Sequence, residues 1–275
     1  MPSPQRSPNR SSIFTGCTPH TTGINRLPKD KPFGLQVGFT DPHRPYKAGA
    51  FHPPHDPKKV QVRKWLPDWP EVKQDMAHSY DFIARMDAEV GRLMELLASQ
   101  GHSNDTMVLF TGDNGMPFPR AKGTLYEAGI HVPLIGWMPG KIAAGSVKKE
   151  MIGHVDLPST WLDAAGIPQS KKMQGKSFLP LLVNQKYEAR TEVFSERNWH
   201  DTFNPMRSIR TERYKFIFNA APHFSYRPPS DLEGSPTRQE LERKLSNWMN
   251  ATYDFLPAGL GAANDPLVRS WPFTL

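Results

Sequence analysis

An aspartate, an asparagine and a lysine stand close together in the sequence, just after a short apolar run. Residues 108–111 read Val-Leu-Phe-Thr, which is typical of a buried strand, and Asp113 and Asn114 follow almost at once. Their carboxylate and amide oxygens are hard ligands that suit a divalent cation, and α/β proteins place such groups at the carboxyl ends of strands. Lys122, in the Pro-rich loop that follows, can meet an anion held by that cation. The segment therefore predicts a site for a metal ion and an anion.

Three apolar runs of strand length and one long helix are expected to position these side chains. The runs cover residues 35–40, 107–111 and 133–137. Between the first two, apolar residues recur at spacings of three and four, which predicts a helix over residues 76–97 with core-facing side chains. These are Phe82, Ile83, Met86, Val90, Leu93, Met94 and Leu97. A strand, a crossover helix and a second strand favour an α/β fold with a mainly parallel sheet and helices packed on it.

The pattern changes in the last third of the chain. Residues 154–167 predict a turn, a short helix and a glycine stop. Further on, residues 206–219 alternate in a way that predicts an antiparallel hairpin, with a charged turn at residues 211–213. We therefore expect an α/β domain over residues 1–187 and a small antiparallel α+β subdomain over residues 188–275.

The composition is typical of a globular protein with an excess of positive charge. The 275 residues, 37% of them hydrophobic, can bury a substantial core. The formal net charge of +7 favours acidic partners such as sulfated glycans, and no motif accompanies it that would indicate nucleic acid. The single cysteine, Cys17, excludes an internal disulfide. We expect no membrane span, because no apolar run approaches ~20 residues, and no signal peptide, because residues 1–12 lack an apolar core.

The segment that carries Asp113 resembles the sulfatases, a family of the alkaline phosphatase superfamily. Five features of the segment occur in the family's order and close to its spacing. They are the strand, Asp113-Asn114-Gly115, Lys122, Glu127-Ala128-Gly129 and Val132-Pro133. Residues 154–167 and 175–182 continue the resemblance. Within the family, residues 116–126 and 205–219 look closest to sulfamidase-like enzymes, which act on N-sulfoglucosamine. The resemblance implies an alkaline-phosphatase-like α/β/α sandwich, here with an incomplete sheet.

The amino-terminal segment resembles the sulfatase signature, with one decisive change. Residues 7–16 and 19–23 match the signature, and Arg6 falls where the family has the cysteine or serine that is oxidised to formylglycine. An arginine cannot be converted to formylglycine, and its fixed charge is no nucleophile. Cys17 does not replace the missing residue, because it lies outside the register set by Arg10. By resemblance, Arg10 would stabilise the formylglycine site.

Two parts of the family pattern are not found in the chain. The strand whose paired aspartates complete the metal shell would precede its first residue, and a stretch with a Gly-Lys-x-His element is absent after Leu27. Residues 35–46, which follow this join, resemble the family strand whose histidine contacts the sulfate or the leaving group. That histidine would be His43. We therefore expect a truncated and internally deleted member of the family.

The resemblance implies a sulfuric ester hydrolase that cleaves sulfate esters or sulfamates on sugars. Asp113 and Asn114 would be Ca²⁺ ligands, Lys122 a sulfate contact and His43 a substrate contact or acid. Calcium takes six to eight oxygens, so two side chains would hold it weakly. Because formylglycine is not possible at Arg6, the catalytic competence of the chain stays open. The expected partner is a sulfated sugar or another anionic small molecule, and family members are usually periplasmic, secreted or lysosomal.

Simpler explanations exist for each of these features. Asp-Asn-Gly after a strand is a turn signal, His43 can be a loop residue bonded to backbone, and Lys122 can be a solvated surface charge. A non-catalytic protein that binds sulfated glycans through Lys122 and His43 is a second functional hypothesis. A phosphatase or phosphodiesterase of the same superfamily is weaker, since it would need more His and Asp ligands. A gene fragment that does not fold stably is a further alternative. The substrate sugar, the compartment and the oligomeric state are not determined by the sequence.

Overall fold

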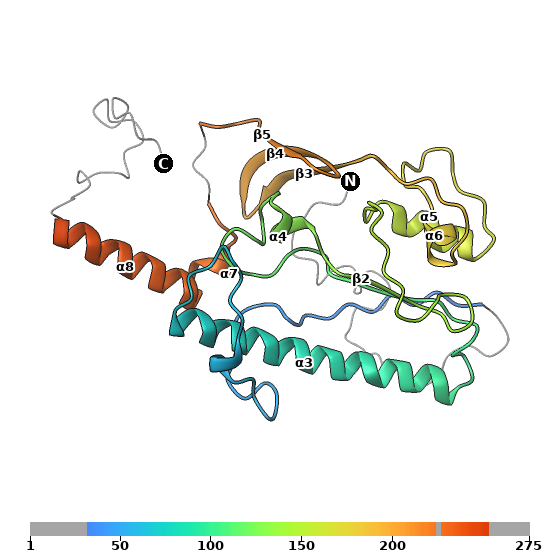
Figure 1. Ribbon diagram of the computed structural model, residues 1–275, viewed down its shortest axis with the longest axis horizontal. Helices are drawn as coiled ribbons and strands as arrows, with labels where there is room; N and C mark the ends of the chain where they lie inside the picture. Colours follow the sequence, from blue (N-terminus) through green and yellow to red (C-terminus); the bar gives the residue numbers. More distant parts are fainter. Residues whose placement is uncertain (1–31, 224–226, 253–275) are drawn as a thin grey trace.

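The computed structural model describes residues 32–223 and 227–252. Its elements are η1 (Pro57–Lys59), α3 (Pro70–Ser99), β1 (Val108–Thr111), α4 (Glu127–Ile130), β2 (Leu134–Trp137), α5 (Asp156–Ala164), α6 (Leu179–Leu182), β3 (Glu192–His200), β4 (Thr202–Thr211), β5 (Lys215–Asn219), α7 (Ser230–Glu233) and α8 (Pro236–Thr252). In Figure 1, α3 runs along one side of the molecule, β1 and β2 cross the middle, and the sheet of β3, β4 and β5 lies on the far side from α3. Among the described residues, no helix is both long and apolar enough to cross a lipid bilayer.

The expected long helix is confirmed as α3. It begins at Pro70, directly after its N-cap Trp69, because the fixed φ of proline is compatible with a first helical position and its missing N–H is not needed there. The amino-terminal part of α3 contributes Val72, Met76 and Ala77 to a buried cluster. Phe118, from the loop that carries Lys122, completes this core and is fully buried.

The expected pairing of the central sheet is wrong for the described residues. β1 pairs with β2 in antiparallel register, with Val108 opposite Trp137 and Thr111 opposite Leu134. Residues 35–40 form no strand in this structure. An extended segment becomes a strand only when a neighbouring backbone satisfies its N–H and C=O groups, and no described segment pairs with this one. The mixed α/β class and the incomplete sheet are as expected.

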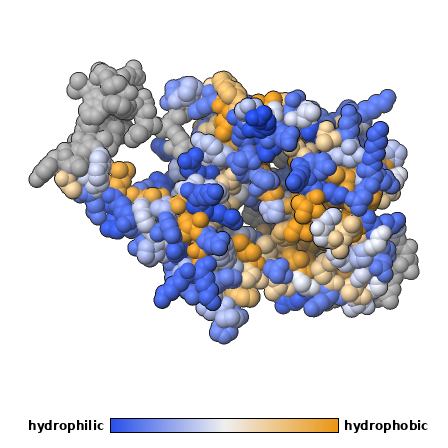
Figure 2. Space-filling model, viewed as in Figure 1, coloured by the Kyte–Doolittle hydropathy of each residue, from blue (hydrophilic) through white to orange (hydrophobic). Residues whose placement is uncertain are grey.

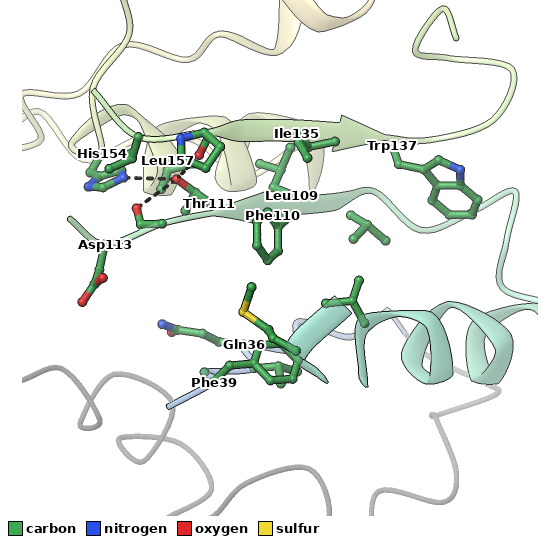
Figure 3. Close-up of a pocket in the computed structure, with 18 of the residues that line it drawn as sticks. Gln36, Phe39, Leu109, Phe110, Thr111, Asp113, Ile135, Trp137, His154 and Leu157 are labelled. Atoms are coloured by element: carbon green, nitrogen blue, oxygen red, sulfur yellow. Dashed lines mark hydrogen bonds between the residues drawn. The ribbon is translucent and has the colours of Figure 1, made fainter. Parts of the chain in front are cut away.

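Helices lie on both sides of the β1–β2 pair. Leu109 and Leu134 pack on one side against the cluster of Leu157, Phe178 and Leu181, which belongs to α5, α6 and the residue before α6. Between the layers the molecule is hollowed, and Figure 2 shows apolar and polar side chains mixed around the hollow. On the opposite face of β1, Phe110 points across this space toward α3 (Figure 3). The space is an open cavity of about 4030 Å³.

Beyond its amino-terminal turns, α3 is less buried than its apolar pattern predicts. Phe82 and Leu97 are buried, whereas Ile83 is 40% exposed. Met86 and Leu93 are half-buried and line the cavity. The difference follows from the sheet, because two strands do not cover a helix of this length and the apolar stripe extends beyond them.

The carboxyl-terminal part of the chain is antiparallel, as predicted. β3, β4 and β5 form a meander in that order, and the turn between β4 and β5 falls at residues 212–214. One face of this sheet is buried through polar side chains, including Asn204 and Ser208. The other face exposes a group of large aromatic side chains: Phe194, Phe203, Phe216 and Phe218. The boundary between residues 187 and 188 stays a prediction. Helix α8, which belongs to the expected carboxyl-terminal subdomain, packs on α3 of the expected α/β domain.

A buried ion pair joins three segments that are distant in sequence. The guanidinium of Arg44 donates two hydrogen bonds to Asp75 of α3, at 2.8 and 2.7 Å, and a third to the carbonyl of Pro117 at 2.9 Å. Asp75 also accepts a 2.6 Å hydrogen bond from the hydroxyl of Thr237 at the start of α8. Both charges are almost fully buried, so their pairing is needed to offset the loss of hydration.

Candidate functional site

The loop between β1 and β2 forms the floor of the candidate site. Gly115 donates a backbone hydrogen bond to Gly129 at 2.9 Å, which folds the loop back against α4. The backbones approach so closely that a Cβ at Gly115 would lie 1.8 Å from the carbonyl oxygen of Ala128. The glycines and Ala128 of the motif thus have a structural role, which is to hold the loop closed.

Glu127, the first residue of α4, belongs to the scaffold rather than to the site. Its carboxylate forms ion pairs with Lys215 and Arg210 of the carboxyl-terminal sheet. Partial burial of the Glu127 carboxyl tends to raise its pKa. The hydrogen bond and the positive charge of Lys215 outweigh this effect, so that the pKa of Glu127 is lowered. These contacts fix the loop that carries Lys122 against β4 and β5.

Asp113 and Asn114 lie directly beyond β1 with exposed side chains. Figure 3 shows the Asp113 carboxylate extending from the strand end beside the cavity, which both residues line. One carboxylate and one amide are suitable oxygen ligands for calcium, but they supply only a small part of its usual shell. No group of three or more His, Cys, Asp or Glu side chains among the described residues could hold a metal ion. The described residues therefore do not by themselves fit a tightly bound calcium ion.

Lys122 is held in the same loop with its side chain only 9% exposed. The neighbouring Phe118 and Ala121 are fully buried, and the backbone N–H of Lys122 donates to Met116 at 3.1 Å. The ammonium Nζ donates to Asp231 Oδ2 at 2.6 Å and lies 3.2 Å from His43 Nε2. A lysine this buried must be paired, so the surface-charge explanation does not hold for it.

His43 is presented by a tight turn after residues 35–40. Its backbone N–H donates to Thr40 at 2.8 Å, and its ring Nδ1 lies 2.5 Å from the carbonyl oxygen of Arg44. Because a carbonyl oxygen can only accept, Nδ1 is the donor in this contact, and Nε2 is the ring nitrogen that faces Lys122. The buried Arg44 next in the chain fixes this turn against α3. Nε2 therefore points at the ammonium and at Asp231 Oδ2, which is 3.5 Å away.

Asp231 is the site residue that sequence reasoning missed. It lies in the short helix α7, and no motif around Ser230-Asp231-Leu232-Glu233 indicates a role. The turn between β3 and β4 places it, since the carboxylate of Asp201 accepts a 2.7 Å hydrogen bond from the backbone N–H of Ser230. Burial tends to raise the pKa of the Asp201 carboxyl, but the hydrogen bond from Ser230 outweighs burial and lowers it.

His200, at the end of β3, is a second residue that the sequence did not indicate. It is 8% exposed and lines the cavity. Burial lowers the pKa of His200, and the positive charges of Lys122 and Arg197 act in the same direction against the carboxylate of Asp201. The imidazole is therefore neutral at pH 7.

The structure thus brings together two of the five site residues predicted from the sequence. His43 and Lys122 are in contact, and Asp113 and Asn114 line the same cavity. Arg10, together with Arg6 and Cys17, lies outside the described residues. The assigned roles of these residues remain predictions.

Two family models match the chain and overlap in the middle of it. The model described as Sulfatase matches residues 7–167, which is more than half of the chain. The chain belongs to the sulfatase family. The model described as N-sulphoglucosamine sulphohydrolase, C-terminal, matches residues 120–253 of this sulfatase-family chain and so includes both Lys122 and Asp231. The resemblance inferred from the β1 segment is confirmed.

Curated relatives of the chain include named sulfatases. It is 31% identical over 249 residues to the N-sulphoglucosamine sulphohydrolase of Homo sapiens, a match that covers 77% of this chain and 49% of the relative. It is 33% identical over 187 residues to an ulvan-active sulfatase of Formosa agariphila, covering 67% of this chain and 31% of that protein. This sulfatase-family chain thus spans less than half the length of either relative.

Solved structures give similar coverage. BT4656, solved in complex with its substrate D-glucosamine-2-N,6-O-disulfate, matches with a TM-score of 0.47 and 21% identity over 73% of this chain and 45% of that one. BT1596, a 2-O GAG sulfatase, matches with a TM-score of 0.48 and 18% identity over 84% of this chain and 56% of that one.

Proposed function

We propose that this sulfatase-family chain binds the anionic group of a sulfated sugar at the cavity wall formed by Lys122 and His43. The observation that carries the proposal is the contact of a nearly buried ammonium with an imidazole, 3.2 Å apart, where both side chains line one open cavity. Lys122 supplies charge and hydrogen bonds to a sulfuryl oxygen, and His43 Nε2 faces the same point. The formal net charge of +7 favours the approach of an anionic ligand.

The proposed ligand is a sugar that carries a sulfate ester or a sulfamate, and N-sulfoglucosamine is the first choice. The match of residues 120–253 to the carboxyl-terminal model of N-sulphoglucosamine sulphohydrolase supports this choice, because the matched region contains both Lys122 and Asp231. The human relative of that name supports it independently. The ulvan-active relative makes ulvan the natural second ligand to test.

The reaction proposed for the intact family site is hydrolysis of the sulfate ester or sulfamate. In such a site Lys122 stabilises charge on the sulfuryl group, and His43, when protonated at Nε2, gives a proton to the leaving oxygen or nitrogen. The chain as it stands has Arg6 where the formylglycine nucleophile is expected, and an arginine side chain cannot attack sulfur. We therefore propose binding of the sulfated sugar with turnover at background.

Calcium is the cofactor that the family resemblance implies, and we propose only a weak site for it. Asp113 and Asn114 are the side chains that would hold the ion, and when bound it would draw the anion toward the end of β1. The two side chains leave most of the calcium shell to water. The anion contacts of Lys122 and His43 do not depend on the ion in this proposal.

The proposal is tested by measuring the binding of N-sulfoglucosamine to the purified chain by isothermal titration calorimetry. Lys122→Ala is expected to reduce affinity by ~10-fold or more, because it removes the charged hydrogen bond to the sulfuryl group. Lys64→Ala, which removes one exposed lysine away from the cavity, is the matched control and should leave affinity unchanged. Equal losses for the two variants would mean that bulk charge, and not a site, retains the sugar.

Sulfate release from N-sulfoglucosamine and from an aryl sulfate provides the second arm. We expect release at background from the chain, and also from Arg6→Cys, because one residue does not restore the rest of the signature. Robust turnover by the unchanged chain would overturn the assignment of Arg6 to the nucleophile position. Robust turnover by Arg6→Cys alone would support that assignment and contradict the expectation that one residue is not enough.

A further inference from the structure

The anion site contains a built-in negative charge. Asp231 Oδ2 lies 2.6 Å from Lys122 Nζ and 3.5 Å from His43 Nε2, so a carboxylate already touches both groups that face the ligand. Its side chain is only 13% exposed, and it does not line the cavity that Lys122 and His43 line. The carboxylate therefore stands behind the ammonium, on the side away from the open space.

This placement leaves Lys122 able to meet a ligand. An ammonium has three N–H donors, and the contacts with Asp231 and His43 use two of them. The third can point into the cavity that Lys122 lines. With Asp231 in place, however, the Lys122–Asp231 pair contributes no net charge to the site.

The distance between a bound anion and Asp231 is limited by geometry. Because an N–H···O bond spans about 2.9 Å and Nζ lies 2.6 Å from Asp231 Oδ2, an oxygen bound to Lys122 lies within about 5.5 Å of the carboxylate. Two charges this close, in a site that is partly shielded from water, repel each other appreciably. The repulsion is proportional to the charge of the ligand. A dianion is therefore disfavoured twice as strongly, in free energy, as a monoanion.

We infer that Asp231 is a specificity-determining residue that makes the site prefer monoanionic sulfate esters and sulfamates over dianions such as inorganic sulfate and phosphate monoesters. This inference rests on the proposed function of Lys122 and His43 as an anion site. A sulfate ester or sulfamate carries one negative charge, whereas free sulfate carries two. Asp231 thus disfavours both phosphorylated sugars and retention of the inorganic product.

The placement of Asp231 is itself supported by other residues. Asp201 caps the backbone N–H of Ser230 and fixes the start of α7, and Leu232, on the same helix, is 2% exposed. Pro229, just before α7, would lie 2.6 Å from a Cβ at Gly123, so this segment packs directly on the Lys122 loop. The counter-charge therefore has a defined position and cannot simply move away when an anion arrives.

The experiment compares Asp231→Asn with the unchanged chain, using N-sulfoglucosamine and methyl sulfate as monoanions and inorganic sulfate as the dianion. Asn keeps the shape and a hydrogen-bonding oxygen but removes the charge. We expect affinity to rise by about fivefold for each monoanion and by about 25-fold for sulfate, because the factor for the dianion is the square of that for the monoanion. Both increases should shrink as NaCl is raised.

Glu233→Gln is the matched control, because it removes a carboxylate from the same short helix at an exposed position. Its effect on all three ligands should be small. Equal changes for monoanions and sulfate in Asp231→Asn, or a loss of affinity for all of them with an unchanged melting temperature, would overturn the inference. A failure of the proposed function looks different, since no ligand would then bind either the unchanged chain or Asp231→Asn in a manner that depends on Lys122.

Discussion

Lys122 illustrates which part of a site a sequence can reveal. Its position in a loop after a strand was predictable, because it stands in a segment that resembles the family, and the structure places it in contact with His43. The anion-binding roles of both residues stay predictions. Asp231 was not predictable, because it is 109 residues from Lys122 in sequence and its neighbours form no motif. Only the fold shows that this carboxylate balances the charge of the buried ammonium.

His200 gives a prediction at the scale of a single residue. Burial lowers its pKa below the value of about 6.5 of an unfolded histidine, so the unfolded chain binds more protons than the folded one at mildly acidic pH. The free energy of unfolding should therefore fall as pH drops below about 6.5. His200→Gln, which cannot titrate, should show a weaker dependence between pH 7 and 5 in urea denaturation.

The carboxylates with lowered pKa values do not confuse this measurement. Asp201 and Glu127 have lowered pKa values, so they stabilise the fold at neutral pH. This stabilisation is lost only when the pH falls to the ordinary carboxyl pKa of about 4 and below. Identical slopes for His200→Gln and the unchanged chain between pH 7 and 5 would show that His200 is not the group responsible.

At the scale of elements, helices were easier to predict than strands. The spacing of apolar residues located α3, and the glycine stop located the end of α5, where Gly166 has a φ of 69°. Residues 35–40 have the composition of a strand but form none. Helical hydrogen bonds are internal to the segment, whereas a strand depends on a partner whose presence its own sequence does not record.

The Arg44–Asp75 pair gives a prediction about how elements are held together. Asp75→Ala leaves the Arg44 guanidinium buried without its partner and removes the acceptor for Thr237, so we expect a loss of about 3–5 kcal/mol in the free energy of unfolding. The double variant Arg44→Met with Asp75→Leu, which removes both charges, should recover part of the loss. Urea denaturation measures all of these values.

A more exposed ion pair on the same helix provides the control. Asp41 pairs with Arg85, whose side chain is 44% exposed. Asp41→Ala should cost no more than about 1 kcal/mol. If Asp75→Ala cost as little, the buried pair would not be what joins α8 to α3.

At the scale of the whole molecule, the sequence predicted a mixed α/β protein with an incomplete sheet, and the structure has this form. The sequence did not predict how the strands and helices would be arranged around this incomplete sheet. The structure leaves a large cavity between α3 and β1–β2 and pairs its two central strands antiparallel. Apolar residues along α3 are only half-buried, because the two strands do not cover the whole helix.

A thermal melt with and without millimolar calcium tests folding and the metal site together. We expect a cooperative transition that calcium raises only slightly, because Asp113 and Asn114 supply so few ligands. A ligand present at its dissociation constant stabilises by only about 0.4 kcal/mol. Asp113→Ala should abolish the small shift, and magnesium provides the ionic-strength control. A large calcium shift that persists in Asp113→Ala would place the ion elsewhere, and the absence of any cooperative transition would identify a fragment that does not fold.

The hydrogen bond between Thr237 and Asp75 spans 162 residues, and this has a consequence during biosynthesis. At a translation rate of about 5–20 residues per second, α3 leaves the ribosome roughly 8–30 s before the residue that completes its polar anchor is made. Lys122 is likewise synthesised before Asp231, the residue that balances its charge. The nascent chain therefore carries Lys122 without its counter-charge, and the Lys122–Asp231 pair can form only after α7 has emerged.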